Sequence, residues 1–207
     1  NPAANTNAYP PTPVASPTNT PTPTRTPTPT RTATPTITPT QTPVPTPVNS
    51  AVIYLSADGS GTVGGVSYGL ADILSYNRTI DTWNMIFDGS DVGLTSNVDA
   101  FFLENDGTIL LSLTLAATLP GAGAVTEADI VRFIPTQLGI TTSGTFTTVL
   151  DGSDVGLDSY SENIDAIGRT ANGNLFISTS GNPSVPGVTG TASDLLVFTA
   201  TSLGDTT

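Results

Sequence analysis

The chain lacks the side chains on which most enzyme mechanisms depend. Its 207 residues include no cysteine, no histidine and no lysine. Without them there is no Ser-His-Asp or Cys-His nucleophile, no Cys-ligated zinc, no Schiff base and no P-loop lysine. Carboxylate pairs remain, but they recur together with their whole turns, as structural elements do. We therefore expect no enzyme and no required cofactor.

Positive charge and long apolar runs are also missing. The five basic residues are all arginine and face 17 acidic residues, for a net charge of −12. Binding to a phosphate backbone relies on lysine and arginine, so no nucleic-acid partner is expected. No apolar run approaches the ~20 residues that cross a bilayer, so no membrane span is expected.

Threonine and proline, by contrast, dominate the first fifty residues. These hold 14 of the 18 prolines and 16 threonines, with no aspartate or glutamate. The rest of the chain carries three arginines against 17 carboxylates, a net charge of −14. The composition predicts two regions, an extended stalk over residues 1–50 and an acidic β-domain over residues 51–207.

The stalk has a two-residue period, because every even position from 18 to 42 is threonine and half of the odd positions between them are proline. Proline fixes its own φ and disfavours helix at the residue before it, which predicts polyproline II backbone. At three residues per turn, this period turns hydroxyls towards every side of the rod. Such tracts are typical of O-glycosylated stalks, and the alternative is an unmodified linker. The candidate O-glycosylated residues are Thr18, Thr20, Thr22, Thr24, Thr26, Thr28, Thr30, Thr32, Thr34, Thr36, Thr38, Thr40 and Thr42.

After Ala51 the apolar runs are short, rich in β-branched and aromatic residues, and separated by Gly, Asn, Asp and Ser. This pattern predicts an all-β domain. Asn-Gly and Asp-Gly turns favour antiparallel hairpins. The expected strands cover residues 51–55, 71–76, 83–87, 98–103, 108–115, 129–134, 145–150, 164–168, 174–179 and 194–199.

An internal repeat sets the expected architecture. The heptapeptide DGSDVGL occupies residues 88–94 and again residues 151–157, and the segments that follow also match. A partial third copy starts at Ala71. Each unit predicts a four-stranded meander of about 60 residues, like a propeller blade. A propeller needs at least four blades, and this chain has about two and a half units. We expect an antiparallel β-sandwich or a prism-like domain.

The last unit lacks the strand that corresponds to residues 144–150 in the fuller copy. An open sheet edge is a template for another chain, so a neighbouring copy could complete it by strand addition. Two alternatives are that the sequence simply stops there, or that residues 51–55 of the same chain fill the gap.

The recurring acidic motif suggests a second hypothesis, a calcium site at Asp88, Asp91, Asp151 and Asp154, because Ca²⁺ takes several oxygen ligands. The spacing matches neither an EF-hand loop nor a calcium β-roll. We favour a turn in which aspartate side chains bind nearby backbone N–H groups. Separately, Asn77 begins an Asn-Arg-Thr sequence that fits the N-glycosylation pattern.

Aromatic residues offer one further candidate site. Trp83, Tyr54, Tyr68, Tyr76 and Tyr160 could form a platform that stacks on sugars. Most of them occupy strand positions, where an aromatic side chain more often belongs to the core.

A Thr/Pro-rich stalk followed by FDGSDVGL-type repeats resembles secreted or surface proteins of bacteria. The Thr-Pro tract also resembles the glycan-coated peptide stems of extracellular fibrils from environmental water samples. The resemblance implies a secreted structural glycoprotein whose copies assemble into a helical fibril or surface appendage. It assigns a role to no individual residue. The alternative function is a stalked cell-surface adhesin or carbohydrate-binding module.

Overall fold

The structure of the chain is a computed structural model that describes residues 51–200 and 203–204. Within these residues every regular element is a β-strand or a short 3-10 turn, and no α-helix is present. The predicted all-β class is confirmed. The stalk and its candidate O-glycosylated threonines lie outside the described residues, so both remain predictions.

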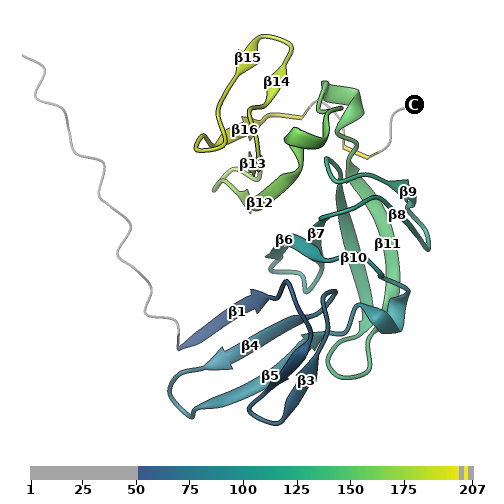
Figure 1. The fold of residues 1–207 in the computed structure, drawn as a ribbon, viewed down its shortest axis with the longest axis vertical. Helices are drawn as coiled ribbons and strands as arrows, with labels where there is room; N and C mark the ends of the chain where they lie inside the picture. The colour runs from purple at the N-terminus through teal and green to yellow at the C-terminus, as the bar shows by residue number, and fades with distance from the viewer. Residues whose placement is uncertain (1–50, 201–202, 205–207) are drawn as a thin grey trace, which may run out of the picture. The chain divides into compact units, whose positions relative to one another are not determined.

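Three antiparallel sheets contain the ten predicted strands, which are all confirmed (Figure 1). The first sheet has the order β1-β4-β5, with bounds Val52–Ser56, Ile73–Asn77 and Thr82–Phe87. The second has the order β6-β7-β10-β11, with bounds Val98–Leu103, Ile109–Leu113, Ile130–Gln137 and Ser143–Leu150. The third has the order β12-β13-β16, with bounds Ile164–Arg169, Leu175–Thr179 and Leu196–Phe198.

Tight turns with glycine connect the first two strands of the second and third sheets. Gly107 and Gly173 have φ of 87° and 89°, values that glycine adopts without a steric penalty. Their N–H groups donate to the carbonyl oxygens of Glu104 and Thr170, at 3.1 and 2.9 Å. These are the Asp-Gly and Asn-Gly turns that the sequence predicts.

Each sheet also has a small hairpin that the sequence reading missed. Their strands have two or three residues each and lack the continuous apolar run that marks β16, where residues 195–198 are all apolar. In each case the strand before the hairpin pairs with the strand after it. The hairpins are β2-β3 (Gly61–Val63, Val66–Tyr68), β8-β9 (Ala117–Leu119, Gly123–Val125) and β14-β15 (Ser184–Val185, Val188–Thr189).

The pairing across these hairpins has one register in all three sheets. In each, the apolar residue two positions after Asp72, Asp129 or Asp194 lies opposite an apolar residue of the strand before the hairpin. The corresponding pairs are Leu74 with Leu55, Val131 with Leu111, and Leu196 with Ile177.

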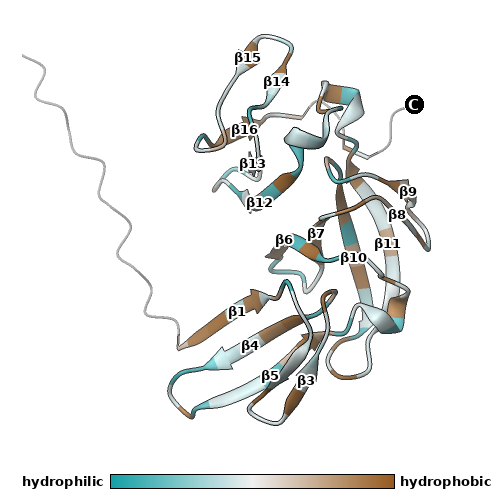
Figure 2. Cartoon of the chain, in the orientation of Figure 1, coloured by the Kyte–Doolittle hydropathy of each residue, from teal (hydrophilic) through white to brown (hydrophobic). Residues whose placement is uncertain are grey.

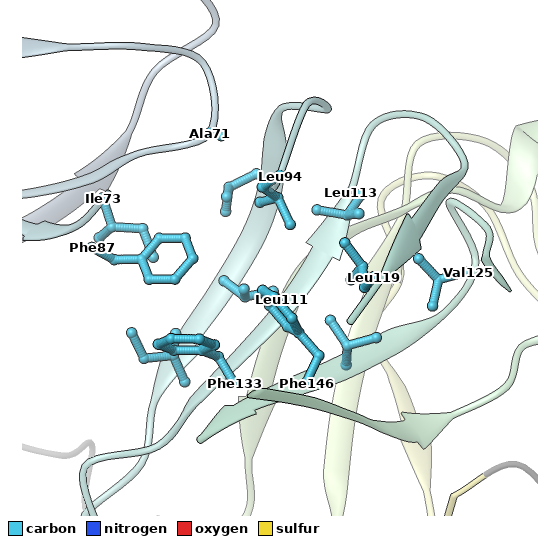
Figure 3. Close-up of a cluster of buried hydrophobic side chains, with 13 residues drawn as sticks. Ala71, Ile73, Phe87, Leu94, Leu111, Leu113, Leu119, Val125, Phe133 and Phe146 are labelled. Carbon is cyan, nitrogen blue, oxygen red and sulfur yellow. The ribbon is translucent and has the colours of Figure 1, made fainter. Parts of the chain in front are cut away.

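The first and second sheets share an apolar core (Figure 3). Phe87 of β5 lies with its ring centroid 5.0 Å from that of Phe133 in β10, which is 5.0 Å from that of Phe146 in β11. At most 1% of each of these three residues is exposed. Burying a phenylalanine side chain contributes about 1.5–3 kcal/mol, so these rings are a main source of stability.

A second core joins the second and third sheets. Leu110 and Ile130 of the second sheet pack there with Ile164, Leu175 and Ile177 of the third. Strand β7 is buried along its whole length, because its alternate side chains enter the two different cores. The second sheet therefore lies between the other two.

The third sheet ends at β16. Among the described residues, β16 pairs with β13 on one side and no strand pairs with its other edge. The alternative that residues 51–55 fill this gap is wrong, because β1 pairs with β4 in the first sheet. β1 is an edge strand of the first sheet, and most of it is coloured as hydrophobic in Figure 2.

Candidate functional site

The DGSDVGL turns follow the last strands of the first two sheets. Asp88 Oδ1 accepts hydrogen bonds from the N–H and hydroxyl of Ser90, at 3.1 and 2.7 Å. Asp151 Oδ1 accepts the same pair from Ser153, at 3.0 and 2.7 Å. In both turns one oxygen of the first aspartate thus holds its own backbone, as in the turn that the sequence analysis favoured.

The second aspartate of the first turn reaches the next sheet. Asp91 Oδ2 accepts the N–H of Thr142, at 2.8 Å, in the connection between β10 and β11. The Thr142 hydroxyl in turn accepts the N–H of Asp88, at 2.9 Å. The motif therefore links the end of the first sheet to the second. Its counterpart Asp154 also has an interaction partner.

A backbone bridge accompanies each turn. The Gly139 N–H donates to the Ile86 carbonyl oxygen, and the Gly204 N–H donates to that of Val149, both at 2.9 Å. Each bridge joins the end of a sheet's last strand to the next sheet, and both are parallel. The same connection thus occurs at both junctions between sheets.

Two buried aspartates outside the motif hold the turns in place. Asp72 accepts the N–H of Gly69, at 2.7 Å, and that of Gly89, at 3.0 Å. Asp129 likewise accepts the N–H of Gly152, at 2.8 Å, and that of Thr126, at 2.6 Å. We call Asp72, Asp129 and their counterpart Asp194 the latch aspartates. The sequence contained the signal, an aspartate at matching places in the repeats, but its role needs the fold.

In the third latch aspartate, Asp194, only one of the two carboxylate oxygens accepts a hydrogen bond from a described residue. Asp194 Oδ2 accepts the N–H and the hydroxyl of Thr191, at 2.8 and 3.0 Å. Within residues 51–200 and 203–204, no glycine N–H donates to its Oδ1. Asp194 is exposed, whereas Asp72 and Asp129 are 6% and 7% exposed. Among the described residues, Asp194 therefore lacks the glycine donor that Asp72 and Asp129 have.

An apolar groove of about 240 Å³ lies beside this aspartate. It opens where the second sheet and its turn meet the unfilled edge of the third sheet. The groove is lined by Leu150, Val155, Leu157, Ile177, Val185, Val188, Leu195, Leu196, Val197 and Phe198. At the corresponding place between the first two sheets, the Phe146 ring occupies the space.

Acidic groups at the junction of the second and third sheets have shifted pKa values. Burial of the Glu162 carboxylate disfavours its charge, but N–H donors from Ser184, Ser159 and Asp158 outweigh burial and lower its pKa. For Asp99, burial dominates and raises the pKa, opposed by a hydrogen bond from Asn163. Glu162 thereby ties the hairpin of the third sheet to the preceding turn.

Two of the five candidate platform aromatics lie together. The Tyr76 and Trp83 rings stack at 4.7 Å with an interplanar angle of 27°, and both are partly exposed. The Tyr76 hydroxyl donates to Asp81 Oδ1, at 2.9 Å, and this hydrogen bond raises the pKa of Tyr76.

The other three platform candidates are distributed over different elements. Tyr54 lies on β1 and Tyr68 on β3, while Tyr160 is in a 3-10 turn near the third sheet. The structure therefore brings together a stacked pair and no five-residue platform.

The predicted N-glycosylation site lies at a turn, and the predicted calcium ligands do not gather into a metal-binding group in the described part of the chain. Asn77 ends β4 at an exposed turn, and its Oδ1 accepts the Thr79 N–H at 2.9 Å. In the described part of the chain, no group of three or more Asp or Glu residues is placed to hold a metal ion. The same residues include no helix long and apolar enough to cross a membrane.

Comparisons with protein-family models, with curated proteins and with solved structures find no match for this chain.

Proposed function

We propose that the chain is a structural subunit of an extracellular glycoprotein fibril or surface appendage, built by contacts between copies of its β-domain. The stalk carries O-linked glycans on the threonines between positions 18 and 42. The proposal is supported most directly by the way the carboxylates are used. In the described turns, Asp72, Asp91 and Asp129 bind backbone N–H groups that join strands or sheets.

We also propose that the three sheets are successive copies of one unit of about 60 residues. Supporting this, the same register, the same latch and the same parallel bridge recur from sheet to sheet. Copies of such a unit pack face to face within one chain. A contact that joins different surfaces of two chains would be heterologous, and such contacts propagate into filaments when they do not close into a ring.

Electron microscopy of the secreted full chain tests this function. We expect filaments under negative stain, with additional density along the stalk. Intact mass tests the glycans, because the unmodified chain has a mass of 21.0 kDa and glycosylation adds to it. A monodisperse monomer of 21.0 kDa would contradict both parts of the proposal.

A carbohydrate-binding module is the second candidate function, and the stacked pair Tyr76 and Trp83 favours it. Aromatic faces bind sugar rings, and both side chains are partly exposed. A glycan-binding assay with Trp83→Ala tests it. Loss of binding in that variant, with binding retained in Tyr160→Ala, would support the module. Absence of glycan binding by the natural chain would remove it.

A further inference from the structure

Among the described residues, two segments lack a contact that their counterparts make: the latch aspartate Asp194 and the Asp-Gly-Ser sequence at 58–60. Asp194 receives no glycine N–H on Oδ1 from any described residue. An Asp-Gly-Ser sequence at 58–60 follows β1, and within the described chain it makes no hydrogen bond to a latch aspartate. We propose that β1 of a second copy pairs antiparallel with β16 and places its Gly59 at Asp194. This inference deepens the proposed function, because it specifies the contact between copies.

The sequence around β1 matches that of a last strand. In β5 and β11, a large apolar residue precedes the glycine of Asp-Gly-Ser by six positions: Trp83 precedes Gly89, and Phe146 precedes Gly152. In β1, Ile53 precedes Gly59 by the same six positions. β5 and β11 are the strands that complete the first and second sheets. β1 therefore carries the pattern that the third sheet lacks.

The register of the second sheet specifies the docked arrangement. There Phe146 lies opposite Phe133. Phe198 occupies the place of Phe133 in the third sheet, so Ile53 of the second copy lies opposite Phe198. Its side chain then enters the apolar groove at the position that Phe146 fills in the complete sheet.

Exposure at the two edges agrees with this pairing. Ile53 is 47% exposed on β1, and Leu195, beside β16, is 65% exposed. The residues at the place of Leu195 in the first two sheets, Ile73 and Ile130, are fully buried. Pairing β1 with β16 removes apolar surface from water on both copies, which favours their association.

The contact joins different surfaces of the two copies. Each copy offers one β1 edge and one β16 edge, and β1 keeps its pairing with β4 while its outer edge is used. Such a head-to-tail interface leaves a free β1 at one end and a free β16 at the other. It therefore adds copies in a row.

A substitution at Gly59 tests the contact between copies without disturbing the fold of a single copy. A Cβ at Gly59 would meet no atom within 4 Å. At Gly89 a Cβ would lie 2.3 Å from the carbonyl oxygen of Ala71, the residue before Asp72. At Gly152 it would lie 2.5 Å from that of Ala128, the residue before Asp129. If Gly59 docks at Asp194 as they dock at Asp72 and Asp129, the substitution blocks docking alone.

We expect Gly59→Ala of the full chain to keep the thermal midpoint of the natural chain, and to weaken self-association at least tenfold in sedimentation velocity. Ser60→Ala is the matched control, because it also changes the turn but adds no atom at the latch. Natural self-association in Gly59→Ala would overturn the inference. So would a natural chain that stays monomeric at every concentration.

Disulfide trapping tests the register, since the chain has no cysteine of its own. The proposed pairing places Tyr54 of one copy opposite Val197 of another, within the Cα separations that a disulfide spans. Tyr54→Cys and Val197→Cys chains, mixed and oxidised, should yield a linked 54–197 peptide. Ile80→Cys is the control, because Ile80 is as exposed as these residues and lies in another turn. Equal linkage of position 197 to position 80 would overturn the pairing.

The two proposals can fail separately. Filaments that persist in Gly59→Ala would leave the fibril subunit standing and remove this contact. A specific 54–197 linkage in a chain that forms no filaments would support the contact and contradict the fibril.

Discussion

The second and third sheets are built on the same plan, yet only the second is complete. It has four strands, and Ile130 and Phe133 of its third strand are fully buried. In the third sheet the described residues supply three strands, and Leu195, at the place of Ile130, is 65% exposed. The difference shows what β11 and its turn contribute to the second sheet. They bury apolar side chains of β10, supply a donor to Asp129 and fill the space that is a groove in the third sheet.

The largest expected difference is in the core. Phe133→Ala should lower the free energy of unfolding by about 3–5 kcal/mol, because its ring is buried between two sheets. Phe198→Ala, at the matching place in the third sheet, should cost less than half as much, because its ring borders an open groove. Urea denaturation of both variants measures this. Equal losses would mean that the groove is already filled in solution.

The latch aspartates should differ next. Asp129→Ala leaves the N–H groups of Thr126 and Gly152 without their acceptor, at about 1–3 kcal/mol for each group that stays buried. Asp194→Ala should cost under about 1 kcal/mol, because the residue is exposed and holds only Thr191. Thermal unfolding of both variants, with Asp72→Ala as a repeat of the buried case, checks the contrast. Losses of similar size at Asp129 and Asp194 would contradict it.

A smaller effect concerns pH at the junction of these two sheets. The pKa of Glu162 is lower in the folded chain than in the unfolded chain, so its contribution to stability is present above the unfolded pKa. That contribution is lost as the pH falls through the folded pKa. Asp99 acts with the opposite sign, since its raised pKa makes the folded state bind a proton more tightly.

Glu162→Gln should therefore flatten the acid side of the stability curve, and Asp99→Asn should steepen it. Denaturation midpoints between pH 3 and pH 7 measure both. A Glu162→Gln curve parallel to that of the natural chain would contradict the assignment.

Metal removal should have the smallest effect. In the first turn Asp88 and Asp91 already accept backbone or hydroxyl hydrogen bonds, and Asp151 does so in the second. We expect EDTA to leave the thermal midpoint unchanged within error. A fall that added Ca²⁺ reverses would revive the calcium hypothesis at these turns.

Much of the fold was predictable because its signals are local. Short apolar runs and Asn-Gly or Asp-Gly turns placed all ten strands of the three larger sheets. The hairpins escaped prediction because their strands of two or three residues are not part of a longer apolar run, as β16 is. Of the candidate sites, the role of Asp88 and Asp151 as turn residues could be inferred, since their partners lie two residues away.

Other parts of the site depend on contacts far apart in the sequence. Asp91 binds the N–H of Thr142, fifty-one positions away, and the Asp72 latch closes on Gly89 across a hairpin. No local pattern states which of several aspartates will find such a partner. The groove beside β16 was equally hidden, because it exists only where two sheets meet beside an unfilled edge.

The sequence by itself determined the all-β class and the strand positions, because period and turn chemistry act over a few residues. It also set the alternation of threonine and proline ahead of the domain and the lack of histidine, cysteine and lysine. Only the tertiary structure decided that β1 pairs with β4, that the repeated aspartates hold sheets together, and that Asp194 binds only Thr191 among the described residues. Those outcomes depend on which surfaces meet when the chain packs, and burial rather than local preference selects them.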